Sequence, residues 1–179
     1  MRLGASALVP TSDMPLAKRF RRALVLPILA LAAAGAPARG ALTLADDLAA
    51  TADEAGRRRV PVMIVFTEAS CPYCARAKRD YLLPMQAHGP FADRMIVREV
   101  DVASDRRLRD FAGRLTTHGE YARRMQVRLV PTVLVVDTRG EPVADPIVGL
   151  LAPDFYQLYL EQAVEAGLLK LRTPADGRR

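Results

Sequence analysis

The feature that most constrains the fold is an almost continuously apolar run, Val60–Phe66, separated by four residues from Cys71-Pro72-Tyr73-Cys74. Such a run is typical of a central strand covered on both faces, as the strands of parallel sheets are. The next residues, Ala75–Leu83, favour a helix that ends near Pro84, and Pro72 suits the first helical turn, where its missing N–H costs nothing. The sequence therefore predicts a buried strand that leads through a short connection into a helix with two cysteines at its start.

The other elements follow from patterning of the same kind. We expect helices over Leu42–Ala55 and Pro153–Ala166, and two short helices around residues 108–115 and 120–125 within a polar insertion (Ala103–Val127). We expect strands over Met95–Val102, Thr132–Val136 and Val143–Leu150, the last of which should bend at Pro146. The first helix should end at Gly56, because glycine is favoured at helix C-termini. The first two strands should be parallel through the cysteine-bearing helix, and the last two antiparallel through a turn at Gly140. This order predicts an α/β three-layer sandwich, with helices on both faces of a mixed sheet and a helical insertion.

Residues 1–38 have the composition of an export signal. A basic segment, Lys18-Arg19-Phe20-Arg21-Arg22, precedes the apolar run Ala23–Ala34, and Ala36-Pro37-Ala38 fits the small-residue cleavage pattern. The run is shorter than the ~20 apolar residues of a spanning helix. We expect residues 1–38 to be a cleaved signal peptide, residues 39–171 a single domain and residues 172–179 a flexible tail; the alternative is an apolar helix of the mature fold. An exported protein works where disulfide chemistry is permitted, and we expect a periplasmic location.

The charge distribution argues against nucleic acid as a partner. The net charge is +6, but residues 1–38 hold five basic residues and one acidic residue, which leaves +2 for residues 39–179. Nucleic-acid binding needs a clustered basic face, which so small an excess does not predict.

The two cysteines, the only ones in the chain, are the candidate catalytic residues. At a helix N-terminus Cys71 would face unpaired amides and the positive end of the helix dipole, which stabilise a thiolate. Cys74, one turn further, would be shielded. Cys71 would then attack a substrate disulfide, and Cys74 would attack Cys71 to release the partner. A structural disulfide is the alternative, but it would close so small a loop that it would constrain the unfolded chain little.

Metal binding is a second alternative for this pair. Two thiolates suit a soft ion such as Cu(I), whereas a zinc site needs further ligands. The only histidines, His88 and His118, have no spacing that implicates them, and we expect both on the surface or in loops. We therefore predict no metal site.

Cys71-Pro72-Tyr73-Cys74 after an apolar strand, together with Val130-Pro131-Thr132 at the start of a later one, resembles the thioredoxin fold. The resemblance spans residues 42–167. It implies that the peptide bond before Pro131 is cis and faces the cysteines, and that the backbone of Val130 pairs with the bound substrate. Pro72, Tyr73 and Thr132 would complete the substrate groove.

The chain departs from the pattern of classical thioredoxins in three places, one of which is Pro72-Tyr73, where they have Gly-Pro between the cysteines. Ser70 stands where classical thioredoxins have tryptophan, and Val65 stands where they bury an aspartate. A different proton acceptor for Cys74 is therefore needed, and Glu68 is the nearest carboxylate in the sequence.

The resemblance implies a periplasmic thiol–disulfide oxidoreductase with no bound cofactor, which reduces or maintains the thiols of client proteins. An exported reductant needs electrons, so a membrane-bound electron donor is the implied partner. Two alternatives stay open on the same fold: a Cu(I) metallochaperone and a non-catalytic assembly module.

Overall fold

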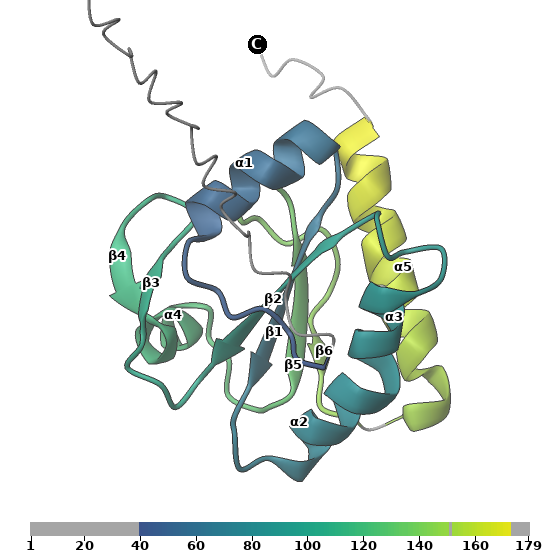
Figure 1. The fold of residues 1–179 in the computed structure, drawn as a ribbon, viewed down its shortest axis with the longest axis horizontal. Coiled ribbons are helices and arrows are strands. Elements are labelled where there is room, and N and C mark those ends of the chain that lie inside the picture. The colour runs from purple at the N-terminus through teal and green to yellow at the C-terminus, as the bar shows by residue number, and fades with distance from the viewer. Residues whose placement is uncertain (1–39, 151, 173–179) are drawn as a thin grey trace, which may run out of the picture. The chain divides into compact units, whose positions relative to one another are not determined.

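The molecule is built on a four-stranded mixed sheet with the strand order β2-β1-β5-β6 (Figure 1). The structure, a computed structural model, describes residues 40–150 and 152–172; the expected signal peptide and residues 173–179 lie outside this part. The strands are β1 (Val62–Thr67), β2 (Ile96–Asp101), β5 (Thr132–Val136) and β6 (Ile147–Val148). β1 pairs parallel with β2 and antiparallel with β5, and β6 pairs antiparallel with β5. The predicted mixed sheet and its strand directions are confirmed.

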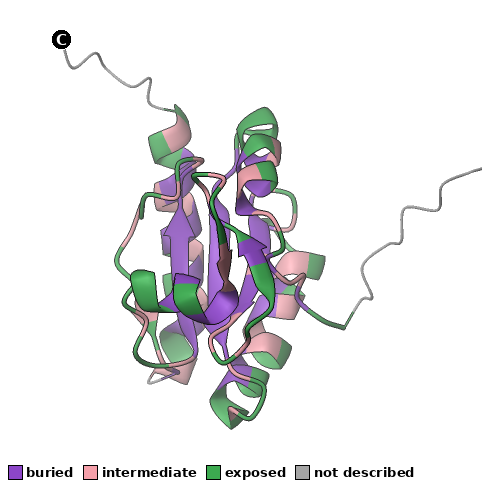
Figure 2. Ribbon diagram, turned by 90° about the vertical axis from the view of Figure 1, so that its left-hand side faces the viewer, coloured by how far each residue is buried: buried purple, intermediate pink, exposed green. Residues whose placement is uncertain are grey.

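Helices cover both faces of the sheet, as predicted. In Figure 1, α2 (Pro72–Ala77), α3 (Leu83–Ala87) and α5 (Pro153–Arg172) lie together on one side, and α1 (Leu48–Arg58) and α4 (His118–Arg124) on the other. Every residue of β1 is buried, so the central strand is covered on both faces (Figure 2). Its burial confirms what the apolar run predicts.

The first helix is shorter at its N-terminus than the sequence predicts. It begins at Leu48 because the Asp47 side chain accepts a hydrogen bond from the N–H of Ala50 (2.8 Å), as an N-cap does. The residues before it extend the sheet instead, with a bridge from Leu44 to Glu99 on β2. At the other end Gly56 lies inside α1, and Arg59 takes the left-handed conformation that caps the helix.

The polar insertion is half hairpin and half helix. Residues 108–115 do not form the expected helix: β3 (Arg107–Arg109) and β4 (Leu115–Thr117) pair as an antiparallel hairpin. The Asp110 carboxylate accepts the N–H groups of Ala112 and Arg114, which turns the chain before a helix can form. The second predicted helix is confirmed as α4, and a capping box between Thr117 and Glu120 fixes its start.

The cysteine-bearing helix does not end near Pro84. It continues through a π-helical segment, η1 (Lys78–Leu82), into α3, which contains Pro84. A proline inside an α-helix lacks an N–H and clashes with the carbonyl four residues earlier, and the wider π-turn relieves this conflict. The last strand is also shorter than predicted, because Pro146 cannot donate to a ladder and only Ile147–Val148 pair. The final helix extends beyond Ala166 to Arg172.

Candidate active site

Cys71 lies at the junction between β1 and α2. The turn after β1 is closed by the N–H of Cys71, which donates to the carbonyl of Glu68 (3.1 Å). Cys71 is the N-cap of α2, and its Sγ accepts a hydrogen bond from the N–H of Cys74 at 3.1 Å. The sulfur thus takes the place of the oxygen of an ordinary cap, where helix amides favour negative charge. Both cysteines are free thiols, Cys71 half-buried and Cys74 only 1% exposed.

The loop before β5 meets Cys71 from the other side. The Cys71 Sγ lies 3.8 Å from the carbonyl oxygen of Val130, and the Val130–Pro131 peptide bond is cis, as the resemblance implies. Pro131 is buried, and its carbonyl accepts the N–H of Gly149 (2.7 Å). Thr132 is buried too, and its hydroxyl donates to the carbonyl of Leu129 (2.8 Å). The fold therefore brings together two motifs that lie far apart in the sequence.

Burial makes Cys74 a different group from Cys71. Burial and a hydrogen bond with Cys71 raise the pKa of Cys74 to about 12, although a backbone hydrogen bond at Glu68 and the charge of Lys78 act to lower it. At neutral pH Cys74 is therefore a protonated thiol, and it must lose a proton before it can attack another sulfur.

Glu68, the expected proton acceptor for Cys74, bonds through its carboxylate to a residue of its own loop. It accepts a hydrogen bond from the Ser70 hydroxyl (2.9 Å), and the contact of Glu68 with Cys74 is through the backbone.

Sequence reasoning missed a partly buried charge pair beside Cys74. Lys78, on the cysteine-bearing helix, bonds the carboxylate of Glu99 on β2 at 2.8 Å, and the hydroxyl of Thr67 donates to the same oxygen at 2.6 Å. Lys78 is four residues after Cys74 and so lies on the same helix face, which is the signal that could have identified it. The pair brings a positive charge close to the buried thiol.

The surroundings of Cys71 are exposed and partly apolar. Pro72 is exposed, Tyr73 is 62% exposed and Leu129, directly before Val130, is 65% exposed. Exposed apolar side chains beside a reactive group are suited to contact with a protein partner. Leu129 was also missed in the sequence analysis, although its place next to the Val130-Pro131 motif could have identified it.

Neither histidine completes a metal site with the cysteines. Within residues 40–150 and 152–172 no three His, Cys, Asp or Glu side chains gather as metal ligands would. His88 is exposed, but the expectation of a surface position is wrong for His118, which begins α4 fully buried. Its Nδ1 accepts the N–H of Asp101 (3.1 Å), so this side chain joins α4 to the end of β2.

The described part of the chain also has no helix long and apolar enough to cross a bilayer.

The chain was compared with known proteins. A family model described as "Thioredoxin-like domain" matches residues 48–164, more than half of the chain. No curated protein matches it significantly.

Three of the similar solved structures are thioredoxins. Mitochondrial thioredoxin 3 from Saccharomyces cerevisiae is 17% identical, with 69% of this chain and 93% of that chain covered and a TM-score of 0.46. Thioredoxin O2 from Arabidopsis thaliana is 18% identical (71% and 97% covered, TM-score 0.48). The periplasmic thioredoxin SoxS from Paracoccus pantotrophus is 15% identical (59% and 97% covered, TM-score 0.43).

Proposed function

The chain belongs to the family of thioredoxin-like domains, and from this premise we propose that it is a thiol–disulfide oxidoreductase that works by dithiol–disulfide exchange. The observation that carries the proposal is the asymmetry of the cysteine pair. Cys71 caps a helix with its sulfur and is half-buried, whereas Cys74 is buried behind it with a raised pKa. One cysteine is thus suited to attack a partner, and the other to stay inert until the first has reacted.

The reaction follows in two balanced steps. The Cys71 thiolate attacks one sulfur of a client disulfide, which forms a mixed disulfide and releases the other client sulfur as a thiolate. Cys74 then loses its proton and attacks the Cys71 sulfur, which closes the Cys71–Cys74 disulfide and releases the second client sulfur. Two electrons pass from the cysteine pair to the client, and no bound cofactor is needed. The Val130 carbonyl beside Cys71, with Pro131 and Thr132 behind it, would hold the client segment.

We place this activity in the periplasm and in the reducing direction. The leader-like composition of residues 1–38 supports export, and the likeness to thiol-maintaining members of the family supports reduction. Outside the cytosol the oxidised cysteine pair must be reduced again after each turnover, so the proposed partners are client proteins and a membrane-bound electron donor.

The test is a redox titration combined with turnover. The protein is equilibrated with dithiothreitol buffers of graded potential, and its free thiols are counted by alkylation. We expect a two-electron couple near that of thioredoxin, about −270 mV. We also expect catalysed reduction of insulin disulfides. Cys71→Ser should abolish it and Cys74→Ser should stall it as a mixed disulfide, whereas Thr138→Ala, which removes a hydroxyl beyond the opposite end of β5, should retain it.

Three results would contradict the proposal in different ways. A potential near −120 mV, typical of a disulfide-donating oxidase, would reverse the direction of electron flow. Tight stoichiometric Cu(I) binding without any turnover would favour the metallochaperone, and a Cys71→Ser protein that keeps its biological role would favour the assembly module.

A further inference from the structure

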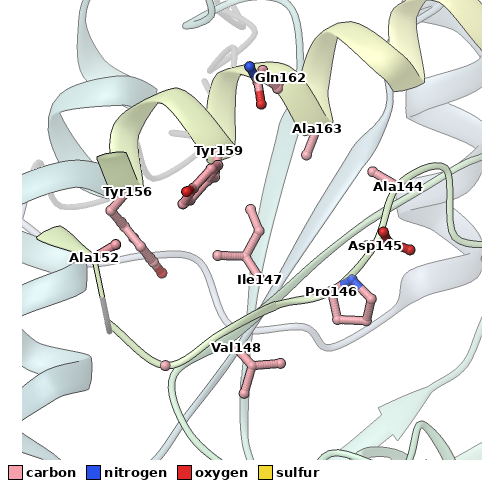
Figure 3. A pocket seen from close by; sticks show the side chains of 11 residues that line it. Ala144, Asp145, Pro146, Ile147, Val148, Ala152, Tyr156, Tyr159, Gln162 and Ala163 are labelled. Atoms are coloured by element: carbon pink, nitrogen blue, oxygen red, sulfur yellow. The ribbon is translucent and has the colours of Figure 1, made fainter. Parts of the chain in front are cut away.

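A pocket of about 490 Å³ lies between β6 and α5, outside the cysteine pair (Figure 3). Ile147 and Val148 line it from β6, and Tyr156, Tyr159 and Ala163 line it from α5. Val148 and Tyr159 are both exposed. The pocket therefore presents apolar walls to solvent, and its volume suits one or two side chains of a partner.

A polar atom without a partner lies in the wall of this pocket. Tyr156 is only 2% exposed, and no described residue forms a hydrogen bond with its hydroxyl. Figure 3 shows the ring extending from α5 toward β6, with the hydroxyl at its far end. The ring itself is held edge-to-face against Tyr81, with centroids 5.0 Å apart. Because buried polar groups are nearly always paired, this hydroxyl indicates a ligand that supplies a hydrogen-bonding atom.

The rim of the pocket carries a negative charge. Asp145 is exposed, and no hydrogen bond or ion pair from the described residues engages its carboxylate. The carboxylate favours a ligand with a basic group next to its apolar part.

The pocket is connected to the cysteine pair through two contacts. Gly149, another residue of its lining, donates its N–H to the carbonyl of Pro131 at 2.7 Å, and the carbonyl of the preceding Val130 lies 3.8 Å from the Cys71 sulfur. On the inner side, burial and the neighbouring Cys74 raise the pKa of the Tyr156 hydroxyl, so this hydroxyl lies close to the buried cysteine. An extended polypeptide advances ~3.3 Å per residue, so a segment held at Cys71 can enter the pocket with a residue only a few positions away.

The neighbouring strand favours an extended polypeptide as the occupant. β6 is the last strand of the sheet, and no described strand pairs with its outer edge. An edge strand offers free backbone N–H and C=O groups to a further strand.

We propose that this pocket is a client-specificity subsite: it binds an extended client segment that inserts an apolar side chain between Ile147 and Ala163, hydrogen-bonds the Tyr156 hydroxyl through a backbone carbonyl and faces Asp145 with a basic side chain. The inference rests on the proposed function and adds to it a class of substrate. The preferred clients carry an apolar residue and a basic residue close to the cysteine that Cys71 attacks.

The test uses short synthetic peptides with one central cysteine joined to 2-nitro-5-thiobenzoate. The Cys71 thiolate forms a disulfide with the peptide sulfur and releases the coloured nitrothiobenzoate anion. Cys74 then releases the peptide thiol, and dithiothreitol restores the pair. In a peptide whose other residues are glycine, a Leu-Arg pair is placed in turn at each position before and after the cysteine. The readout is the kcat/KM of each peptide divided by that of N-acetylcysteine joined to the same group.

Wild-type protein is expected to prefer one Leu-Arg position over the all-glycine peptide by about five-fold or more. In Tyr156→Phe and Asp145→Asn this preference should fall by about two- to five-fold, toward that of the all-glycine peptide, whereas Asp105→Asn, the matched change at an exposed carboxylate outside the pocket, should retain it. If Tyr156 were merely structural, removing its unpaired hydroxyl would leave the peptide preference intact. A lost preference in Tyr156→Phe therefore separates a role in binding from a role in folding.

The negative outcomes are also distinct. Turnover of the N-acetylcysteine substrate with no preferred peptide position, or with a preference that both pocket variants retain, would overturn the subsite alone. A wild-type protein that turns over neither kind of substrate would overturn the subsite together with the proposed function.

Discussion

At the scale of single residues, two identical side chains three positions apart differ in chemistry because the helix start separates them. Cys71 lies outside the first turn and its sulfur receives an amide hydrogen bond, while Cys74 lies inside and loses its contact with water. This division could be predicted from the sequence, since it needs only a helix that begins at Pro72. The partly buried pair of Lys78 and Glu99 could not be predicted, because one member comes from a helix and the other from a strand, and they meet only in the folded protein.

The raised pKa of Cys74 has a consequence for stability. The pKa of the Cys74 thiol is about 12 in the folded protein and 9.0 in the unfolded chain. Between these values the folded state holds more protons than the unfolded state, so the stability of the reduced protein falls as the pH rises. In urea titrations we expect this fall to be steeper in wild type than in Cys74→Ser, by up to about 1.4 kcal/mol per pH unit. Parallel curves for the two proteins would argue against a buried, protonated Cys74.

Lys78 should make Cys74 easier to deprotonate. Its charge acts to lower the pKa of Cys74, so Lys78→Met should raise that pKa further and leave less thiolate for the second step. Because a thiolate with a higher pKa is also a better nucleophile, we expect only about a three-fold slower release of a bound client at pH 7. Stopped-flow release from a preformed mixed disulfide measures this rate. Arg79→Met, which alters the adjacent exposed cation, is the control; equal rates in both variants would show that Lys78 has no such role.

At the scale of elements, periodicity identified the long strands and helices but misassigned the polar insertion. Apolar residues at helical spacing suggested a helix over residues 108–115, yet the chain turns there into the β3–β4 hairpin. The deciding group is Asp110, whose carboxylate bonds the backbone of its own turn. Such local side-chain bonds compete with a helix without changing the apolar pattern. The extension of the cysteine-bearing helix past Pro84 was missed for a related reason, since proline normally ends an α-helix but is accommodated by a π-turn.

Asp110 should therefore be essential to the insertion. Burial acts to raise its pKa, but hydrogen bonds from the backbone and the guanidinium of Arg114 outweigh burial, and the pKa of Asp110 lies below its ordinary value. Arg124, on α4, bonds the same carboxylate at 3.0 Å. We expect Asp110→Asn to destabilise the protein by about 2 kcal/mol at pH 7, because the backbone and guanidinium donors around this buried side chain lose a charged acceptor.

The pH dependence of this loss supplies a second readout. The stabilisation from Asp110 is present above the pKa of the unfolded aspartate and disappears as the pH falls through its lower folded value. The gap between wild type and Asp110→Asn in urea midpoints should thus close in acid. Asp105→Asn, at an exposed carboxylate close by, should shift the midpoint little at any pH; a gap that persists in acid would refute the assignment.

At the scale of the whole molecule, the sheet order places the cysteine motif and the Val130-Pro131 motif together at the C-terminal end of the central strand, β1. β1 leads into Cys71, and β5 begins beside it with Pro131, so the antiparallel pairing of these two strands brings the motifs together. Both strands and their motifs can be predicted from the residue pattern alone. It did not predict the pocket between β6 and α5, because a cavity depends on how two separate elements pack.

The proposed export concerns the whole chain and is directly testable. Expression of the full chain in a bacterium with two membranes should yield a periplasmic protein whose N-terminus, by mass spectrometry, lies near residue 39. Changing Lys18, Arg19, Arg21 and Arg22 to glutamine should keep the uncleaved chain in the cytoplasm. An unprocessed wild-type chain in the cytoplasm would contradict the proposed location but not the chemistry of the cysteine pair.

The measurement that tests the central claim most directly is a brief exposure of the reduced protein to iodoacetamide at pH 7, followed by peptide mapping. The division of roles between the cysteines predicts carbamidomethylation of Cys71 and an unmodified Cys74, with both modified after unfolding in urea. Equal labelling of the two cysteines in the native protein, or labelling of Cys74 first, would contradict it.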